Sequence, residues 1–178
     1  LSTTNRALSG EAAEVAAALD GVINHSGTVA ATTTHNLAQL KSISSGTSGT
    51  ITLNSYTEAL SGSTADLKAA LSGTFANPYT GTVEITDTGT TDITATHITD
   101  INGTNTGTIT VANAIDINGS GSEVKAAFDA IDTNTGNATA NITGTDYHIA
   151  QLKSINNKTT GAIVLATPTA TLSGEVAD

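Results

Sequence analysis

Carboxylates beside turn-forming residues are the side chains whose types and spacing best suit chemistry in this sequence. Oxygen-rich turns of this kind can hold Ca²⁺, which takes six to eight oxygen ligands. The candidate calcium ligands are Asp87, Asp92, Asp116, Asp129 and Asp132. The sequence lacks both the EF-hand loop and the Gly-Gly-x-Gly-x-Asp nonapeptide, and Asp, Asn and Gly also form turns without a metal. We therefore predict no resident cofactor, with calcium as the alternative.

The histidines offer little basis for catalysis. His35, His97 and His148 each precede or begin a predicted helix, which indicates one repeated structural position. A histidine base needs an adjacent nucleophile and an orienting acid. Asp146 lies near His148, but with 50 Ser and Thr residues in the chain a nearby hydroxyl carries no information. There is no Gly-x-Ser-x-Gly elbow, His-Glu-x-x-His pair or phosphate-binding loop, so we predict that the protein is not an enzyme.

Threonine pairs on predicted strands suggest a binding face. Two strands would present Thr-x-Thr outward, and a regular grid of hydroxyl and methyl groups could order water as an ice-binding surface does. The residues of this predicted face are Thr50, Thr52, Thr108 and Thr110. Equivalent positions elsewhere hold Ala30, Glu84 and Val164, which interrupt the grid. Threonine is also simply a favourable solvent-facing strand residue.

Six five-residue stretches predict the strands that would position these side chains. Each alternates apolar and polar residues with a period of two, which is typical of a short strand buried on one face. Each opens on glycine. The stretches are 27–31, 49–53, 81–85, 107–111, 136–140 and 161–165.

A second pattern, with apolar residues every three to four positions, predicts six short amphipathic helices. Several of these stripes follow a hydroxyl residue that could cap the helix, with an acidic residue in the first turn. The predicted caps are Ser9, Ser61, Ser120 and Thr143. Helices of two to three turns are marginal alone, so they must pack on their neighbours.

Internal repetition decides the predicted organisation. Residues 35–43 recur as 148–155 when Asn36 is treated as an insertion, and Leu8-Ser9-Gly10-Glu11 recurs at 172–175. A period of about 22 to 32 residues, with one helix and one or two strands each, is typical of a solenoid.

The predicted fold is α/β: a right-handed α/β solenoid of about six coils, with short parallel strands on one face and short helices on the other. The whole chain, 1–178, would be a single repeat segment excised from a longer array, because neither end carries an evident polar cap. The predicted coils are 8–33, 34–59, 60–87, 88–116, 117–141 and 142–171, with another beginning at 172–178.

Composition supports stacked coils and excludes several classes of protein. Thr, Ala, Gly and Ser supply 94 of the 178 residues, and such small side chains suit closely stacked coils. A net charge of −10 argues against nucleic acid as a partner. The absence of cysteine excludes disulfides and a thiol nucleophile. No apolar run approaches the ~18 residues of a membrane span.

The Leu-Ser-Gly-x-x-Ala-x-Leu sequence at 60–67 and the Gly-Thr-Ile-Thr-Leu strand at 49–53 resemble those of the very large, repeat-rich cell-surface exoproteins of bacteria, cyanobacteria in particular. This resemblance implies a structural or adhesive role at the cell surface, with no catalytic residues to transfer. The leucine-rich-repeat consensus is a weaker comparison, because no repeat here reproduces it.

The predicted function is a non-catalytic structural repeat module of a large extracellular or cell-surface protein, acting as spacer or scaffold. Its partners would be neighbouring repeats of the same polypeptide, with other surface proteins or glycans as further candidates. The alternative is a binding module for glycan, Ca²⁺ or ice. Tyrosines at 56, 79 and 147 could stack on sugars, but they occupy different repeat positions.

Overall fold

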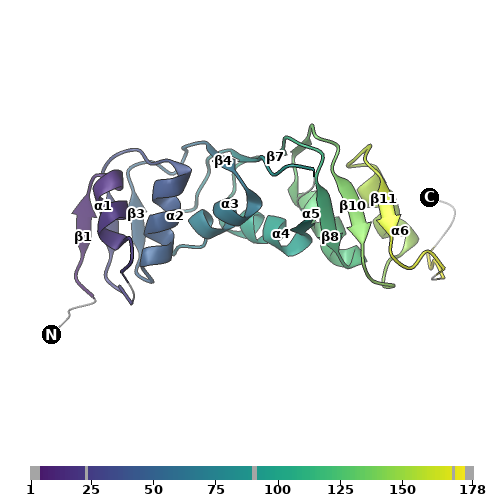
Figure 1. The fold of residues 1–178 in the computed structure, drawn as a ribbon, viewed down its shortest axis with the longest axis horizontal. Helices are drawn as coiled ribbons and strands as arrows, with labels where there is room; N and C mark the ends of the chain where they lie inside the picture. Colours follow the sequence, from purple (N-terminus) through teal and green to yellow (C-terminus); the bar gives the residue numbers. More distant parts are fainter. Residues whose placement is uncertain (1–4, 23, 90–91, 170, 175–178) are drawn as a thin grey trace. The chain divides into compact units, whose positions relative to one another are not determined.

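The computed structural model describes residues 5–22, 24–89, 92–169 and 171–174. Across these residues the chain is a mixed α/β protein with six helices and short parallel strands, which confirms the predicted class (Figure 1). The helices are α1 (Ala12–Leu19), α2 (Leu37–Gly46), α3 (Thr64–Leu71), α4 (Ala95–Thr104), α5 (Gly121–Ala130) and α6 (Ile149–Asn156). The strands are β1 (Leu8–Gly10), β2 (Val29–Ala31), β3 (Ile51–Leu53), β4 (Leu60–Gly62), β5 (Val83–Ile85), β6 (Asp92–Thr94), β7 (Ile109–Val111), β8 (Asp116–Gly119), β9 (Thr133–Asn134), β10 (Thr139–Ile142) and β11 (Ile163–Leu165).

The chain folds into two compact units. Unit 1 contains residues 1–83 and 103–108, and unit 2 contains residues 84–102 and 109–178. We describe each unit separately.

In unit 1, three strands form the parallel sheet β1-β2-β3. The register pairs Leu8 with Val29 and Val29 with Ile51, so that apolar side chains stack on the inner face. Helices α1, α2 and α3 pack side by side in chain order (Figure 1). The core of the unit lies between helices and strands, where Leu40 and Ile51 are completely buried.

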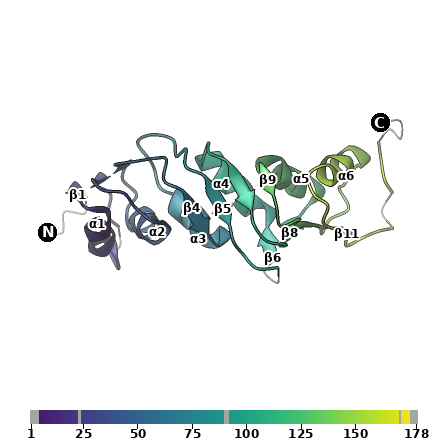
Figure 2. The same ribbon diagram turned by 90° about the horizontal axis from the view of Figure 1, so that it is seen from above.

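In unit 2, four strands form the parallel sheet β11-β10-β8-β6. Its register pairs Ile93 with Ile117, and Ala140 with both Ile117 and Ile163. Helices α5 and α6 pack against each other on one side of this sheet (Figure 2). Phe128 of α5 is 1% exposed and belongs to the resulting core.

Five of the six predicted strand stretches contain a complete observed strand, and the sixth is displaced. In the stretch 136–140 the strand β10 begins only at Thr139 and continues to Ile142. Asn137 has a positive φ of 52°, a conformation typical of turns. The chain therefore turns where strand was predicted, and the alternation that buries Ala140 and Ile142 starts later.

The helix caps differ from prediction at three of four positions. Ser120 caps α5, as predicted, by accepting the Glu123 N–H at 3.3 Å. Ser61 instead lies inside β4, and Ser63 caps α3. Hydroxyl residues are too common in this chain for spacing alone to identify the one at the helix boundary.

The other two predicted caps, Ser9 and Thr143, precede the observed starts of α1 and α6. Ser9 belongs to β1, and the first amide of α1 instead donates to Thr33 Oγ1, 21 residues further along the chain, at 3.0 Å. Thr143 lies well before α6, whose N-cap is His148. A contact distant in sequence decides the first of these helix starts, and an intervening turn decides the second; neither is evident from the local sequence.

The observed helix starts also correct the alignment of the internal repeat. Residues 35–62 align with residues 147–174 without any insertion, and 14 of the 28 positions are identical. Asn36, the N-cap of α2, aligns with His148, the N-cap of α6. The segment α2–β3–β4 therefore recurs as α6–β11 followed by residues 172–174. Residues 175–178 of the predicted further coil lie outside the described residues.

The histidines consequently do not share one position. His35 precedes its cap and is buried, where the repeat has buried Tyr147. His148 is an exposed cap, and His97 lies within the first turn of α4.

Glycine opens the strands because neighbouring backbones approach there too closely for a side chain. A Cβ added to Gly49 would lie 2.0 Å from the carbonyl oxygen of Gly27. A Cβ at Gly27 would lie 2.2 Å from the carbonyl oxygen of Arg6. Neither contact is sterically allowed, so glycine is required at positions 27 and 49 by the close approach of the neighbouring backbones.

We predict that Gly49→Ala lowers the free energy of unfolding by about 1–3 kcal/mol, the usual cost of overpacking. The matched control is Gly103→Ala in α4, where nothing lies within 4 Å of the added Cβ. The control should leave stability unchanged or raise it by up to about 1 kcal/mol through helix propensity. Chemical denaturation of both variants measures the difference, and equal effects would contradict the steric explanation.

Candidate functional site

The most enclosed polar cluster in unit 1 joins His35, Tyr79 and the backbone of Glu58. His35 is 7% exposed and Tyr79 is completely buried. Tyr79 Oη donates to the Glu58 carbonyl oxygen at 2.8 Å and lies 3.1 Å from His35 Nε2. Since the tyrosine hydrogen is used, Nε2 carries a proton and donates to Oη. The two rings also make an edge-on contact with centroids 5.9 Å apart.

The electrostatics of this cluster favour neutral side chains. Burial lowers the pKa of His35 below its usual 6.5, although the nearby Glu58 carboxylate opposes the shift. Burial likewise raises the pKa of Tyr79. His35 Nδ1 is buried without a hydrogen-bond partner, so protonation there would place an unpaired charge in the interior. The cluster therefore suits a brace between segments 44 residues apart better than proton transfer.

His25 is the second buried histidine of unit 1, and it is fully satisfied. Its Nδ1 lies 2.9 Å from Thr47 Oγ1, and its Nε2 lies 2.9 Å from the carbonyl oxygen of Arg6. Both rings thus connect segments that lie far apart in the sequence. Sequence analysis missed this role, because the contacting residues are 19 to 44 positions away.

Three exposed threonines of unit 1 lie in neighbouring segments of the chain. The amides of Leu8, Val29 and Ile51 donate to the carbonyl oxygens of Thr28, Thr50 and Thr74, respectively. Thr28 and Thr50 directly precede β2 and β3, and Thr74 precedes Phe75, which forms an isolated parallel bridge with Ile51.

Thr52 lies beside Ala30 in the same sheet of unit 1. Thr108 lies in unit 1, beside Thr82, whereas Thr110 belongs to β7 in unit 2 and pairs with Thr133. The structure therefore brings Thr50 together with other threonines, but it does not gather the four predicted residues into one described face.

Among the predicted calcium ligands, the register of unit 2 places two side by side. Asp92 of β6 pairs with Asp116 of β8. Asn118 Nδ2 donates to Asp92 Oδ1 at 3.4 Å, and Asn141 Nδ2 donates to Asn118 Oδ1. This row of amides and carboxylates crosses three strands.

The other three acidic candidates have contacts elsewhere. Asp129 forms an ion pair with Lys125 one helical turn away. Asp132 Oδ2 accepts the Ile109 N–H at 2.8 Å, and the Asp87 carbonyl oxygen accepts from Asn113. In the part of the chain that the structure describes, no group of three or more His, Asp or Glu side chains could hold a metal ion.

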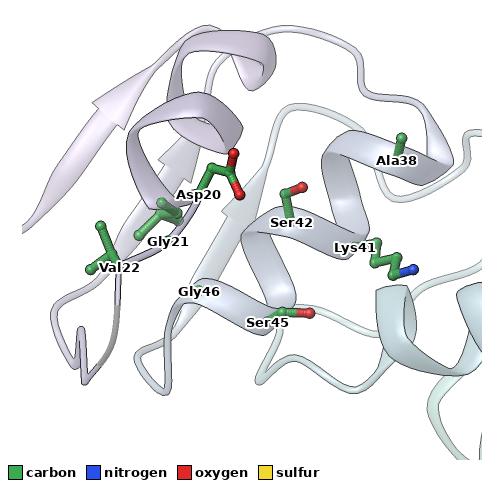
Figure 3. A pocket seen from close by; sticks show the side chains of 9 residues that line it. Asp20, Gly21, Val22, Ala38, Lys41, Ser42, Ser45 and Gly46 are labelled. Atoms are coloured by element: carbon green, nitrogen blue, oxygen red, sulfur yellow. The ribbon is translucent and has the colours of Figure 1, made fainter.

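An open groove of about 440 Å³ lies between the end of α1 and helix α2 in unit 1 (Figure 3). Asp20, Ser42 and Ser45 supply its polar atoms. Lys41 extends toward α3, where it contacts Asp66 (Figure 3). The groove thus offers a carboxylate and two hydroxyls without a histidine among its lining residues.

The tyrosines do not form a sugar-binding platform. Tyr79 and Tyr147 are 0% and 2% exposed, so neither presents a ring face to solvent. Tyr147 Oη donates to the Thr167 carbonyl oxygen at 2.6 Å. Only Tyr56 is partly exposed.

Comparisons with protein-family models, with curated proteins and with solved structures found no match. Among the described residues, no helix has the length and apolar character needed to cross a membrane.

We predict that unit 1 loses stability as the pH falls below about 6.5. The pKa of His35 is lowered in the folded protein, so the unfolded chain takes up a proton that the folded chain excludes. Stability from this residue is therefore complete above its usual pKa and declines on acidification, with a slope of at most about 1.4 kcal/mol per pH unit.

Urea denaturation between pH 7 and pH 5 measures this slope in the wild type, in His35→Phe and in His97→Gln. His35→Phe should flatten the pH dependence of unit 1, whereas His97→Gln, which lies in unit 2, should leave the pH dependence of unit 1 unchanged. An unaltered slope of stability against pH in His35→Phe would contradict the assignment of the pH dependence to His35.

Proposed function

We propose that this chain is a non-catalytic structural repeat segment that acts as a spacer or scaffold in a large extracellular or cell-surface protein. In this proposal the chain is a right-handed α/β solenoid of about six coils. Its partners are neighbouring repeats of the same polypeptide, with other surface proteins and glycans as further partners.

The observation that carries the proposal is the recurrence of α2–β3–β4 as α6–β11 and residues 172–174. Fourteen identical residues in 28 keep the same helix, turn and strand in the same order. The identities include both the small residue that opens the strand, Gly49 or Gly161, and the apolar residues that follow it. A sequence that keeps these residues preserves the packing of one repeat on the next, which an elongated repeat array requires.

The extracellular location rests on composition and on the resemblance to bacterial surface exoproteins. The chain is acidic, lacks cysteine and is rich in threonine. The absence of a catalytic role is proposed because the enclosed histidines brace segments that lie far apart in the sequence, and because no histidine lines the groove beside α1.

A tandem fusion tests the scaffold proposal. One, two and three copies of residues 8–171 are joined so that Leu8 of each following copy takes the position of Leu172, since the two share the Leu-Ser-Gly-Glu sequence. The maximum dimension from small-angle scattering should grow by a constant increment, and thermal stability should rise with copy number. Copies that behave as independent bodies joined by flexible links would overturn the proposal.

The alternative function is ice binding, and the group of Thr28, Thr50 and Thr74 is the observation that favours it. Three exposed threonines on neighbouring segments offer methyl and hydroxyl groups to solvent. Thermal hysteresis of the purified chain measures this activity directly. Thr50→Lys should abolish it, whereas Thr145→Lys in an exposed turn of unit 2 should leave it intact. No hysteresis in the wild type would exclude the alternative.

A further inference from the structure

The two copies of the internal repeat differ in what covers them. In unit 1, Leu40 and Ile51 are completely buried and Leu60 is 1% exposed. At the aligned positions of unit 2, Leu152 and Ile163 are only half-buried, and Leu172 is 48% exposed. The same apolar side chains therefore lie under a covering layer in one unit and at an open face in the other.

In unit 1 the covering layer consists of α3 and the residues that follow it. Ser44 Oγ of α2 donates to the Ala70 carbonyl oxygen at 2.5 Å, and Lys41 forms an ion pair with Asp66. The backbone of Ile51 is also covered. Its N–H donates to the Thr74 carbonyl oxygen at 2.8 Å, and its carbonyl oxygen accepts from the Ala76 N–H at 2.8 Å.

Within the described residues of unit 2, no segment covers the corresponding groups. The Ala162 carbonyl oxygen accepts from Ala140 of β10, and the Ala166 N–H donates to Ile142 of β10. Because alternate residues of a parallel strand hydrogen-bond to opposite neighbours, the N–H and carbonyl groups of Ile163 point away from β10. Lys153, which aligns with Lys41, forms no ion pair within the described part of the chain. We define the C-terminal docking face as Leu152, Lys153, Ile163, Leu165 and Leu172.

We propose that the C-terminal docking face binds a helix-and-strand segment of the same kind as residues 63–85. This inference rests on the proposed function and deepens it, because it names the surface and the chemistry by which another repeat attaches. The argument is a comparison within one molecule: unit 1 holds the same coil with its covering segment in place.

The chemistry of the occupant follows from the segment that covers α2. Its helix opens on a hydroxyl cap and buries apolar residues at spacings of three and four, which are Leu67, Ala70 and Leu71 in unit 1. An acidic residue at the position of Asp66 meets the lysine of the face. A strand then follows and supplies a carbonyl oxygen and an N–H to Ile163, as Thr74 and Ala76 do for Ile51.

A transplantation experiment tests the proposal. Residues 175–178 are replaced by the sequence of residues 63–85, so that Gly174 is followed by the segment that follows Gly62. Hydrogen exchange is then measured at the Ile163 amide, which should slow at least about tenfold when it acquires a carbonyl partner. Unchanged exchange at Ile163 in the extended chain overturns the proposal.

Matched variants separate docking from a general change in stability. In the extended chain, aspartate at the transplanted positions of Leu67 and Leu71 should abolish the protection of Ile163. Leu172→Asp should also abolish it, yet leave the unextended chain unchanged, because that side chain is already 48% exposed. Leu60→Asp, at the aligned but buried position, should destabilise unit 1 in both chains.

The ion pair gives a second control. Lys153→Glu should weaken protection of Ile163 in the extended chain, and lysine at the transplanted Asp66 position should restore it. The proposal of the docking face and the proposal of the scaffold can be refuted separately. Tandem copies that add length without protection of Ile163 in the extended chain would refute the face alone, whereas protected Ile163 with independent tandem copies would refute the scaffold alone.

Discussion

Backbone stacking at the spacing of a parallel sheet is the constraint on which the rest of this structure depends. Neighbouring strands of a sheet lie about 4.7–4.9 Å apart, whereas helices that pack side by side usually lie about 8–10 Å apart. Side chains must be small wherever both spacings have to be met. Gly27 and Gly49 leave room for the neighbouring carbonyl oxygens, and Gly46 leaves room for Leu19 of the adjacent helix. A composition dominated by four small residue types is the consequence.

Polar residues in the interior serve the same stacking. His25 and His35 each use a ring nitrogen to contact a residue that is distant in the sequence, and the Tyr79 hydroxyl donates to the Glu58 carbonyl oxygen. Such contacts hold short helices that would be marginal alone. The hydrogen-bonding capacity of these side chains is directed at the backbone and side chains of residues 19 to 44 positions away in the sequence.

Five of the eleven described strands, β2, β3, β5, β7 and β11, were predictable from sequence, because each carries its own alternation and follows its own glycine. Strands β1, β4, β6, β8 and β9 lie outside the six predicted stretches. The stretch 136–140 failed where Asn137 takes a turn conformation that the alternation does not reveal. Helix boundaries were less predictable, since Ser61 and Ser63 are equally good caps until the extent of β4 is known. The candidate sites were the least predictable feature of the protein. Asp92 and Asp116 meet only through the register of β6 and β8, which depends on how the intervening helix returns the chain.

The sequence by itself determined a mixed α/β fold with short parallel strands, because period-two and period-three-to-four patterns are local properties of the chain. Only the tertiary structure decided which apolar residues are buried. Leu60 and Leu172 stand in the same Leu-Ser-Gly sequence, yet one is 1% exposed and the other 48%. The physical reason is that a short helix and strand cannot bury their own apolar face, so burial depends on the segment that packs against them.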